Sequence, residues 1–134
     1  MNGVRLGHPD ATLGYFTQFQ RRIPYNAYDV TALLRPGTNT LSTLLGNGWY
    51  SAPSDNKFMP VLGYRPVGVR SLRALCNVML GNGKILRFGS GGEGSAWPWR
   101  HGAGSLVVDQ LFLGETIDNR LATPGWQLNE FNGE

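Results

Sequence analysis

The sequence has few of the residues that form disulfides, metal sites or nucleic-acid interfaces. One cysteine, Cys76, excludes an intrachain disulfide and a cysteine-based zinc site. The two histidines, His8 and His101, have no Asp or Glu at ligand spacing, so no metal site built on side-chain nitrogens is expected. Calcium stays open, because it takes oxygen ligands. Charged residues make up only 16% of the chain, and the ten arginines and two lysines are dispersed, so nucleic acid is not an expected partner.

Long apolar runs are also absent from the sequence. No stretch of 18 apolar residues occurs, which excludes a membrane-spanning helix, and Met1 is followed by Asn-Gly-Val-Arg rather than by the apolar run of a signal peptide. The expectation is a soluble protein outside the membrane. The unpaired Cys76 slightly favours a reducing compartment such as the cytoplasm. Phosphate-binding loops, dinucleotide fingerprints and Ser/Cys/His nucleophile patterns are missing as well.

Turn-forming residues are abundant instead. Nineteen glycines and eight prolines make up about a fifth of the 134 residues, and no window shows a sustained 3.6-residue apolar period. The composition predicts an all-β fold with many short strands and tight turns, in a single domain that spans residues 1–134.

The stretch Tyr25–Tyr50 organises the chain. Asp29 is placed to cap a short helical turn over residues 30–34, and Pro36-Gly37 stops that turn. Residues 39–45 alternate as a strand does, and Gly46-Asn47-Gly48 then ends the strand ahead of Trp49 and Tyr50. One short helical turn and one strand are therefore expected here.

Two later segments also read as strands. Residues 67–80 alternate apolar and polar side chains, and Asn82-Gly83 predicts a type I′ hairpin back to a strand over residues 85–88. Residues 106–113 are apolar at positions on both faces, which predicts a strand buried on both sides. That strand leads directly into the polar segment 114–120.

Two blocks of sequence carry a family resemblance. The first is YDVTALLRPGTN…LLGNGWY, and the second is LGETIDNRLATPGW over Leu113–Trp126. Together they resemble the N-terminal β-sandwich domain of bacterial α-L-rhamnosidases of glycoside hydrolase family 78, whose closing motif has the form GE-x-YDAR…GW. The resemblance covers nearly the whole chain and implies an antiparallel, jelly-roll-like β-sandwich. Ser95 and Ala96 precede Trp97 where the family usually has a Thr-Asp or Ser-Asp pair, which puts any role of that acidic position in doubt.

The resemblance also bears on catalysis. Glycoside hydrolysis needs two carboxyl groups about 5 Å or 6.5–9.5 Å apart. Glu115 and Asp118 are the only close pair outside the tail, and residues three apart on a strand point to opposite faces. In the resembling family, the catalytic acid and base lie in a separate (α/α)₆-barrel that has no counterpart here. No catalytic residue is therefore predicted. A structural or interface motif is expected instead, comprising Asp29, Glu115, Asp118, Arg120 and Trp126.

Sugar binding is the remaining chemistry that the residues suggest. It needs an aromatic ring to stack on a sugar face and nearby polar groups to read hydroxyls. The candidate residues are Asn47, Trp49, Tyr50, Trp97, Trp99 and His101. Some domains related to the family bind L-rhamnose with calcium, so the resemblance implies a lectin-like role. The same tryptophans also fit a packing role.

A second class of function stays open beside this one. Asn2-Gly3 is a hairpin signal with no strand before it, whereas the resembling family has an aromatic-rich strand before an equivalent turn. The resemblance therefore implies a domain truncated at its N-terminus, with an unpaired edge that invites a partner strand or a second copy of the chain. The preferred function is a non-catalytic, carbohydrate-associated domain of an α-L-rhamnosidase-like protein, with a catalytic domain as partner. The alternative is a degenerate sandwich used for protein–protein interaction or homodimerisation.

Overall fold

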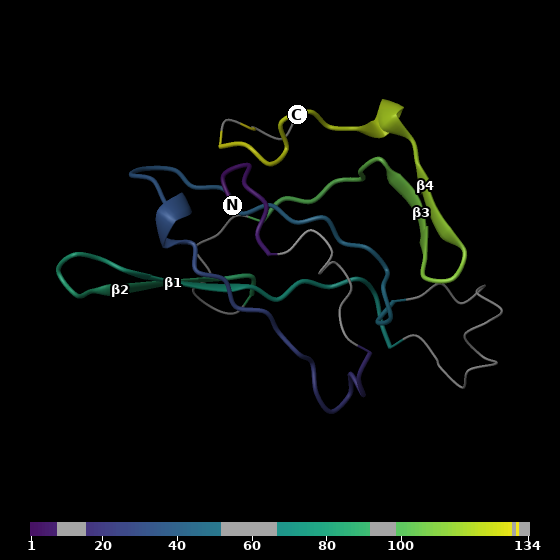
Figure 1. Ribbon diagram of the computed structural model, residues 1–134, viewed down its shortest axis with the longest axis horizontal. Helices are drawn as coiled ribbons and strands as arrows, with labels where there is room; N and C mark the ends of the chain where they lie inside the picture. Colours follow the sequence, from purple (N-terminus) through teal and green to yellow (C-terminus); the bar gives the residue numbers. More distant parts are fainter. Residues whose placement is uncertain (8–15, 52–66, 92–98, 130, 132–134) are drawn as a thin grey trace. The chain divides into compact units, whose positions relative to one another are not determined.

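The computed structural model describes residues 1–7, 16–51, 67–91, 99–129 and 131. Its regular elements are short, and in chain order they are the 3₁₀ turn η1 (Thr31–Leu33), the strands β1 (Leu75–Met79), β2 (Ile85–Gly89), β3 (Leu106–Gln110) and β4 (Gly114–Ile117), and the 3₁₀ turn η2 (Asn119–Leu121) (Figure 1).

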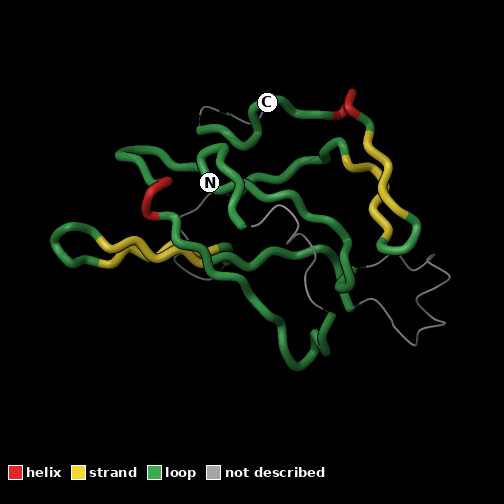
Figure 2. The backbone as a smooth tube through the Cα atoms, in the orientation of Figure 1, coloured by secondary structure: helices red, strands yellow, loops and turns green. Residues whose placement is uncertain are grey.

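The strands form two antiparallel two-stranded sheets, β1–β2 and β3–β4, and the described backbone between the elements is loop (Figure 2). These elements confirm the all-β fold class and the one predicted helical turn. A jelly-roll sandwich stays a prediction. No helix in the described part of the chain is long and apolar enough to cross a bilayer.

The chain divides into two compact units. The first consists of residues 1–70 and 103–134, and the second of residues 71–102. Each unit is described by itself below. A single domain over residues 1–134 stays a prediction.

The N-terminal turn of the first unit is the hairpin-type turn that its sequence predicts. Asn2 and Gly3 both have positive φ, 49° and 78°, and the Val4 N–H donates to the Met1 carbonyl over 2.9 Å. Asn and Gly are the residues that tolerate this left-handed backbone best. The turn therefore forms from local preference.

The Asn2 side chain is only 8% exposed and ties this turn to residues 33–40. Its Nδ2 donates to the Leu33 carbonyl and to Asn39 Oδ1, each over 2.8 Å, and its Oδ1 accepts from the Thr40 N–H over 2.8 Å. The Asn2 backbone N–H in turn donates to the Thr40 carbonyl over 2.9 Å. Both N–H bonds of the carboxamide and its oxygen are thus hydrogen-bonded, as burial of a polar side chain requires.

The strand expected over residues 39–45 is wrong. The structure has loop throughout this segment. Both backbone groups of Thr40 bond to Asn2, so a single residue takes the place of a partner strand. Alternating side chains make a strand only where a neighbour continues the ladder, and here the ladder stops after one residue.

Asp29 bonds an amide of η1 as predicted, although the N-cap position itself is Val30, which has no side-chain cap bond. Its Oδ1 accepts from the Thr31 N–H over 2.9 Å. The hydrogen bond with the Thr31 side chain, followed by this backbone bond, lowers the pKa of the Asp29 carboxyl. After η1, Asn39 Oδ1 accepts from the Arg35 N–H over 2.9 Å and Asn39 Nδ2 donates to the Arg35 carbonyl over 2.8 Å, across the Pro-Gly turn. Gly37 in that turn has φ +84°, which explains why glycine stands there.

The C-terminal segment returns along residues 38–42. Ser42 Oγ donates to the Trp126 carbonyl over 3.4 Å, and Asn129 Nδ2 donates to the Thr38 carbonyl over 3.1 Å. A Cβ at Gly3 would lie 3.0 Å from the Leu128 side chain, so the same segment also packs on the N-terminal turn. The two motif blocks, distant in sequence, therefore lie side by side in this unit.

The predicted strand over residues 106–113 is a hairpin instead. β3 ends at Gln110, a turn closed by the Leu113 N–H and the Gln110 carbonyl (3.1 Å) follows, and β4 returns from Gly114, whose φ is +88°. Val107 and Val108 are 48% and 41% exposed, so the expectation of burial on both faces is wrong. A register shift between Leu106 and Val108 gives β3 one extra residue, which breaks the simple alternation.

The second unit contains the hairpin β1–β2, which the sequence predicted with a different turn and a longer first strand. The strand expected over residues 67–80 is wrong in its extent, because β1 begins at Leu75 and residues 67–74 are not strand. Only Gly83 has positive φ, at +80°, and its N–H donates to the Leu80 carbonyl over 2.9 Å while the Leu80 N–H donates to the Lys84 carbonyl over 2.8 Å. The loop thus has three residues, 81–83, rather than the two of a type I′ turn. Gly in the left-handed region after such a turn is the usual three-residue solution.

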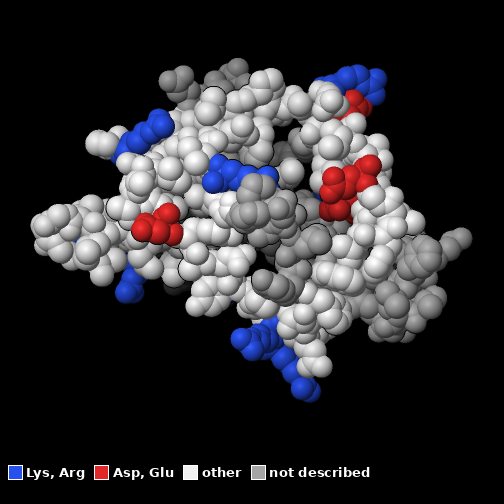
Figure 3. Space-filling view, in the orientation of Figure 1, with Lys and Arg blue, Asp and Glu red and all other residues white. Residues whose placement is uncertain are grey.

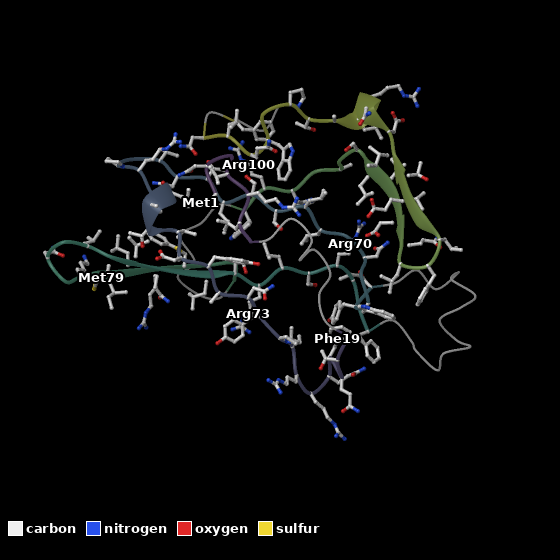
Figure 4. All side chains as sticks on the ribbon, in the orientation of Figure 1. Met1, Phe19, Arg70, Arg73, Met79 and Arg100 are labelled. Atoms are coloured by element: carbon white, nitrogen blue, oxygen red, sulfur yellow. The ribbon has the colours of Figure 1, made fainter. Side chains whose placement is uncertain are left out.

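Side chains alternate along β1 as predicted, and the exposed face carries large apolar residues on both sides of Asn77. Leu75, Met79 and Ile85 are 70%, 76% and 52% exposed, and Met79 is labelled in Figure 4. Met79 lies directly opposite Ile85 in the register, while Cys76 and Val78 on the other face are half-buried. The exposed face of this hairpin therefore carries three large apolar side chains, interrupted by the polar pair Asn77–Arg87.

Candidate functional site

The turn that follows Gly46 carries three of the predicted sugar-binding residues, Asn47, Trp49 and Tyr50. The Asn47 carbonyl accepts from the Ser51 N–H and from Ser51 Oγ, each over 3.1 Å, which closes the turn around the two aromatic residues. Gly48 within the turn has φ +51°. All residues of the turn from 47 to 51 are half-buried.

Strand β3 anchors this turn through Asp109. The Asn47 N–H donates to the Asp109 carboxylate, and Asn47 Nδ2 donates to the Asp109 backbone carbonyl over 2.6 Å. A carboxylate that accepts a backbone N–H makes a charge-assisted hydrogen bond, stronger than a neutral one. Asp109 was not singled out from the sequence. Its one signal there is that an acidic side chain interrupts an otherwise apolar strand.

Aromatic rings pack against the turn edge-to-face. The Trp49 ring lies 5.2 Å from the Phe16 ring and 5.7 Å from the Phe112 ring, at interplanar angles of 66° and 80°. The Tyr50 ring lies 5.5 Å from the ring of Phe19, which is labelled in Figure 4, at 89°. T-shaped pairs at these distances are favourable geometries for aromatic side chains. Trp49 and Tyr50 thus pack within the fold while keeping part of their surface exposed.

The other predicted sugar-binding residues lie elsewhere in the chain. Trp97 is outside the described residues. Trp99 is 38% exposed, His101 is exposed, and both belong to the second unit. Within the first unit, the structure brings together Asn47, Trp49 and Tyr50.

Asp118 belongs to a local ion pair. Asp118 Oδ1 accepts from the Arg120 backbone N–H over 3.0 Å and from Arg120 Nε over 2.9 Å, while Oδ2 lies 2.6 Å from an Arg120 guanidinium nitrogen. The Arg120 side chain lowers the pKa of the Asp118 carboxyl, and Asp118 raises the pKa of Arg120. Red and blue atoms lie together at η2 in Figure 3. This carboxylate caps η2.

Glu115 lies opposite Asp109 rather than beside Asp118. The register pairs Asp109 with Glu115 across β3–β4, so both carboxylates share one face of the hairpin, where Figure 3 shows red atoms over these strands. The sequence missed this pair, because it depends on where the chain turns between Gln110 and Gly114. Glu115 is exposed, whereas Asp109 is half-buried against Asn47.

The described carboxylates do not assemble a metal site. Among residues 1–7, 16–51, 67–91, 99–129 and 131, no three His, Cys, Asp or Glu side chains gather at metal-binding distances. Asp109 is taken up by Asn47 and Asp118 by Arg120. A calcium site would therefore need oxygen ligands other than the carboxylates of Asp109 and Asp118, such as backbone or amide carbonyls.

Trp126 is the remaining member of the predicted structural motif. It is 37% exposed, and its carbonyl accepts from Ser42 Oγ. It therefore lies where the second motif block meets the segment that precedes the aromatic turn.

Comparison with known proteins gives the family of this chain. The model of the α-L-rhamnosidase N-terminal domain matches residues 1–134, the whole length of the chain. The chain belongs to this family. The resemblance read from the two motif blocks is thereby confirmed.

Relatives of this N-terminal domain are parts of much larger proteins. An α-L-rhamnosidase of Streptomyces avermitilis is 36% identical over 127 residues, which cover 94% of this chain and 11% of that protein. Two α-L-rhamnosidases of Formosa agariphila are 26% and 27% identical, covering 87% and 98% of this chain but 12% and 13% of theirs. The chain thus spans about an eighth or less of the relatives it matches, and it matches their N-terminal domain rather than their catalytic domain. No solved structure matches it.

Proposed function

We propose that this chain is a non-catalytic, carbohydrate-associated domain of an α-L-rhamnosidase-like protein, and that its Asn47–Ser51 turn contacts L-rhamnose-containing glycans. The family match over the whole chain is the observation that carries the first part. The second part rests on the turn, where a partly exposed indole, a phenol and a carboxamide lie within four residues.

The turn has the properties that sugar recognition requires. Phe16 and Phe112 contact the Trp49 ring edge-to-face, so the indole does not have to be ordered when a sugar stacks on its exposed part. A preorganised ring saves the entropy that a mobile side chain would lose on binding. Asn47 and Ser51 provide amide and hydroxyl groups close to that ring.

Hydrolysis would then belong to another part of the larger protein. Asp118 is bound by Arg120, and Glu115 is paired with Asp109 across β3–β4. The two carboxylates of the closing motif are therefore not arranged as a catalytic pair. The isolated chain should therefore release no 4-nitrophenol from 4-nitrophenyl α-L-rhamnoside above the buffer rate. Release that exceeds this rate, and that survives repurification, would contradict the proposal.

Sugar binding is tested by titrating the ¹⁵N-labelled protein with L-rhamnose, with and without calcium. Saturable shifts of the Trp49 indole N–H and of the amides of residues 47–51 are expected. L-mannose, which differs only by a hydroxyl on the methyl carbon, is the matched sugar control, and Trp49→Ala is the matched protein control. Shifts confined to the second unit would place the sugar at Trp99 and His101 instead. The absence of any saturable shift would contradict binding.

A specific observation favours homodimerisation as a second candidate. The exposed face of the β1–β2 hairpin carries Leu75, Met79 and Ile85, and a two-stranded hairpin is marginally stable unless its apolar surface is covered. The N-terminal edge that the sequence suggested is less suited, because both backbone groups of Thr40 are already bonded to Asn2. Sedimentation velocity over a concentration series tests this candidate. A dimer that Met79→Ser abolishes would support it, and a monomer at all concentrations would exclude it.

A further inference from the structure

Asp109 contacts the aromatic turn at its first residue and at two different groups. Its carboxylate accepts the Asn47 N–H, and its backbone carbonyl accepts from Asn47 Nδ2 over 2.6 Å, across a separation of 62 residues. Asn47 is therefore held by main chain and side chain together, which fixes both the position and the direction of the peptide that starts the turn.

Gly46 makes room for this carboxylate. A Cβ built on Gly46 would lie 2.5 Å from Asp109 Oδ2 and 3.5 Å from Asp109 Cγ. Real Cβ atoms do not approach an oxygen that closely, so any larger residue at position 46 must displace the carboxylate or the turn. Gly46 does not have a left-handed φ, so space rather than backbone conformation explains the glycine.

The rest of the turn depends on Asn47. Its carbonyl accepts both hydrogen bonds from Ser51, so Asn47 and Ser51 bracket Trp49 and Tyr50. Phe112, three residues after Asp109, contacts the Trp49 ring at 5.7 Å. The β3–β4 hairpin therefore holds the turn twice, through the backbone at Asn47 and through the ring at Trp49.

We propose that Asp109 is the positioning residue of the aromatic turn, which it holds through Asn47 in the space that Gly46 leaves free. It sets the orientation in which the Trp49 and Tyr50 rings are presented. This inference concerns the same turn as the proposed function, and its bearing on sugar affinity rests on that function. The positioning itself does not.

Glu115 offers a matched control for the carboxylate. It lies on the same rung of the β3–β4 ladder as Asp109, and it is exposed. Removing it changes the net charge of the chain as much as removing Asp109 does. Gly104 serves as the control for Gly46, because a Cβ there would make only an ordinary contact, 3.9 Å from the Leu44 side chain.

The test is hydrogen exchange and indole chemical shift in the ligand-free protein. In Asp109→Ala, the Asn47 amide should exchange on the order of 10- to 100-fold faster, the range for losing a hydrogen bond to a charged group. The indole N–H resonance of Trp49, assigned by its loss in Trp49→Phe, should shift. Amides of the β1–β2 hairpin should keep their protection, whereas a residue that merely stabilised the fold would alter all protected amides together.

Several variants keep the test decisive if Asp109→Ala does not fold. Asp109→Asn preserves the shape and removes the charge, so it should accelerate exchange at Asn47 less than the alanine does. Gly46→Ala should move the same resonances with Asp109 intact. Glu115→Ala and Gly104→Ala should leave them in place. Unchanged exchange at Asn47 in both Asp109→Asn and Gly46→Ala, or equal acceleration in Glu115→Ala, would overturn the proposal.

Sugar titration of the same variants separates this inference from the proposed function. If the native protein binds L-rhamnose, Asp109→Ala should bind it at least several-fold more weakly while Glu115→Ala binds as the native protein does. If the native protein binds no L-rhamnose, the proposed function fails, and the exchange data on Asn47 still decide whether Asp109 positions the turn.

Discussion

The buried Asn2 side chain makes three hydrogen bonds within the first unit, and its removal tests the fold directly. Asn2→Gly keeps the left-handed backbone of the N-terminal turn and deletes the carboxamide. The Leu33 carbonyl and the Thr40 N–H each lose the hydrogen bond they make to the carboxamide, and Asn39 Oδ1 loses one of its two donors. Each unsatisfied, partly buried group costs about 1–3 kcal/mol. Because Asn39 keeps its bonds to Arg35 and water can reach part of the site, we expect a loss of about 2–4 kcal/mol.

A second substitution separates the hydrogen bonds from the backbone conformation. Asn2→Ala deletes the same carboxamide and must also hold alanine at φ 49°, where a residue with a Cβ loses a further ~1–2 kcal/mol. The free energy of unfolding from urea titration, followed by tryptophan fluorescence, gives both values. The difference between the variants measures the backbone cost, and the glycine variant measures the network. A loss below about 0.5 kcal/mol in Asn2→Gly, the usual size of a surface change, would refute this reasoning.

Three further predictions concern local structure. Arg120→Met should raise the pKa of the Asp118 carboxyl toward its ordinary value, as carboxyl ¹³C shifts would report, and an unchanged titration would contradict the ion pair. Because that pKa is lowered in the folded state, the stabilisation is present above the unfolded-state value of about 3.9 and is lost as the pH falls through the folded value. Arg120→Met keeps the backbone N–H bond to Asp118, so it should show a smaller loss than the native protein. Gly83→Ala should destabilise the β1–β2 hairpin by about 1–2 kcal/mol, because Gly83 has a φ of +80°. Gly81→Ala should cost less, because a Cβ at Gly81 would have no atom within 4 Å. Equal losses of unfolding free energy in urea titration would rule out the three-residue loop. Asp29→Ala should speed exchange of the Thr31 amide selectively, because the cap bond is lost, and unchanged exchange would show that the cap does not form in solution.

Features that depend on a few adjacent residues could be read from the sequence. The Asn2-Gly3 turn, the Asp29 cap, the Pro-Gly stop and the β1–β2 hairpin all follow from local backbone preferences, and the structure has each of them. The type of the second turn was wrong, because Asn82-Gly83 fits both a two-residue and a three-residue loop. Only the register of the paired strands, Met79 opposite Ile85, distinguishes the two.

Features that depend on distant residues could not be read in this way. The alternating segment 39–45 has a strand pattern, yet its backbone partner is one buried asparagine rather than a strand. Among the candidate site residues, the sequence found the turn with Trp49 and Tyr50 but not Asp109, which contacts it from 62 positions away. Phe16 and Phe112, which pack on Trp49, were missed for the same reason.

The sequence by itself determined the family, through its two motif blocks, and it determined the β class and the positions of the local turns, because turn residues act through backbone preferences within a few positions. The tertiary structure decided which carboxylates meet. Asp109 lies opposite Glu115 and binds Asn47, while Asp118 is taken by Arg120. The Asp109–Glu115 pairing follows from strand register, and a shift of one residue in that register would turn these two side chains to opposite faces. The Asp118–Arg120 pair is local, because its residues are two apart.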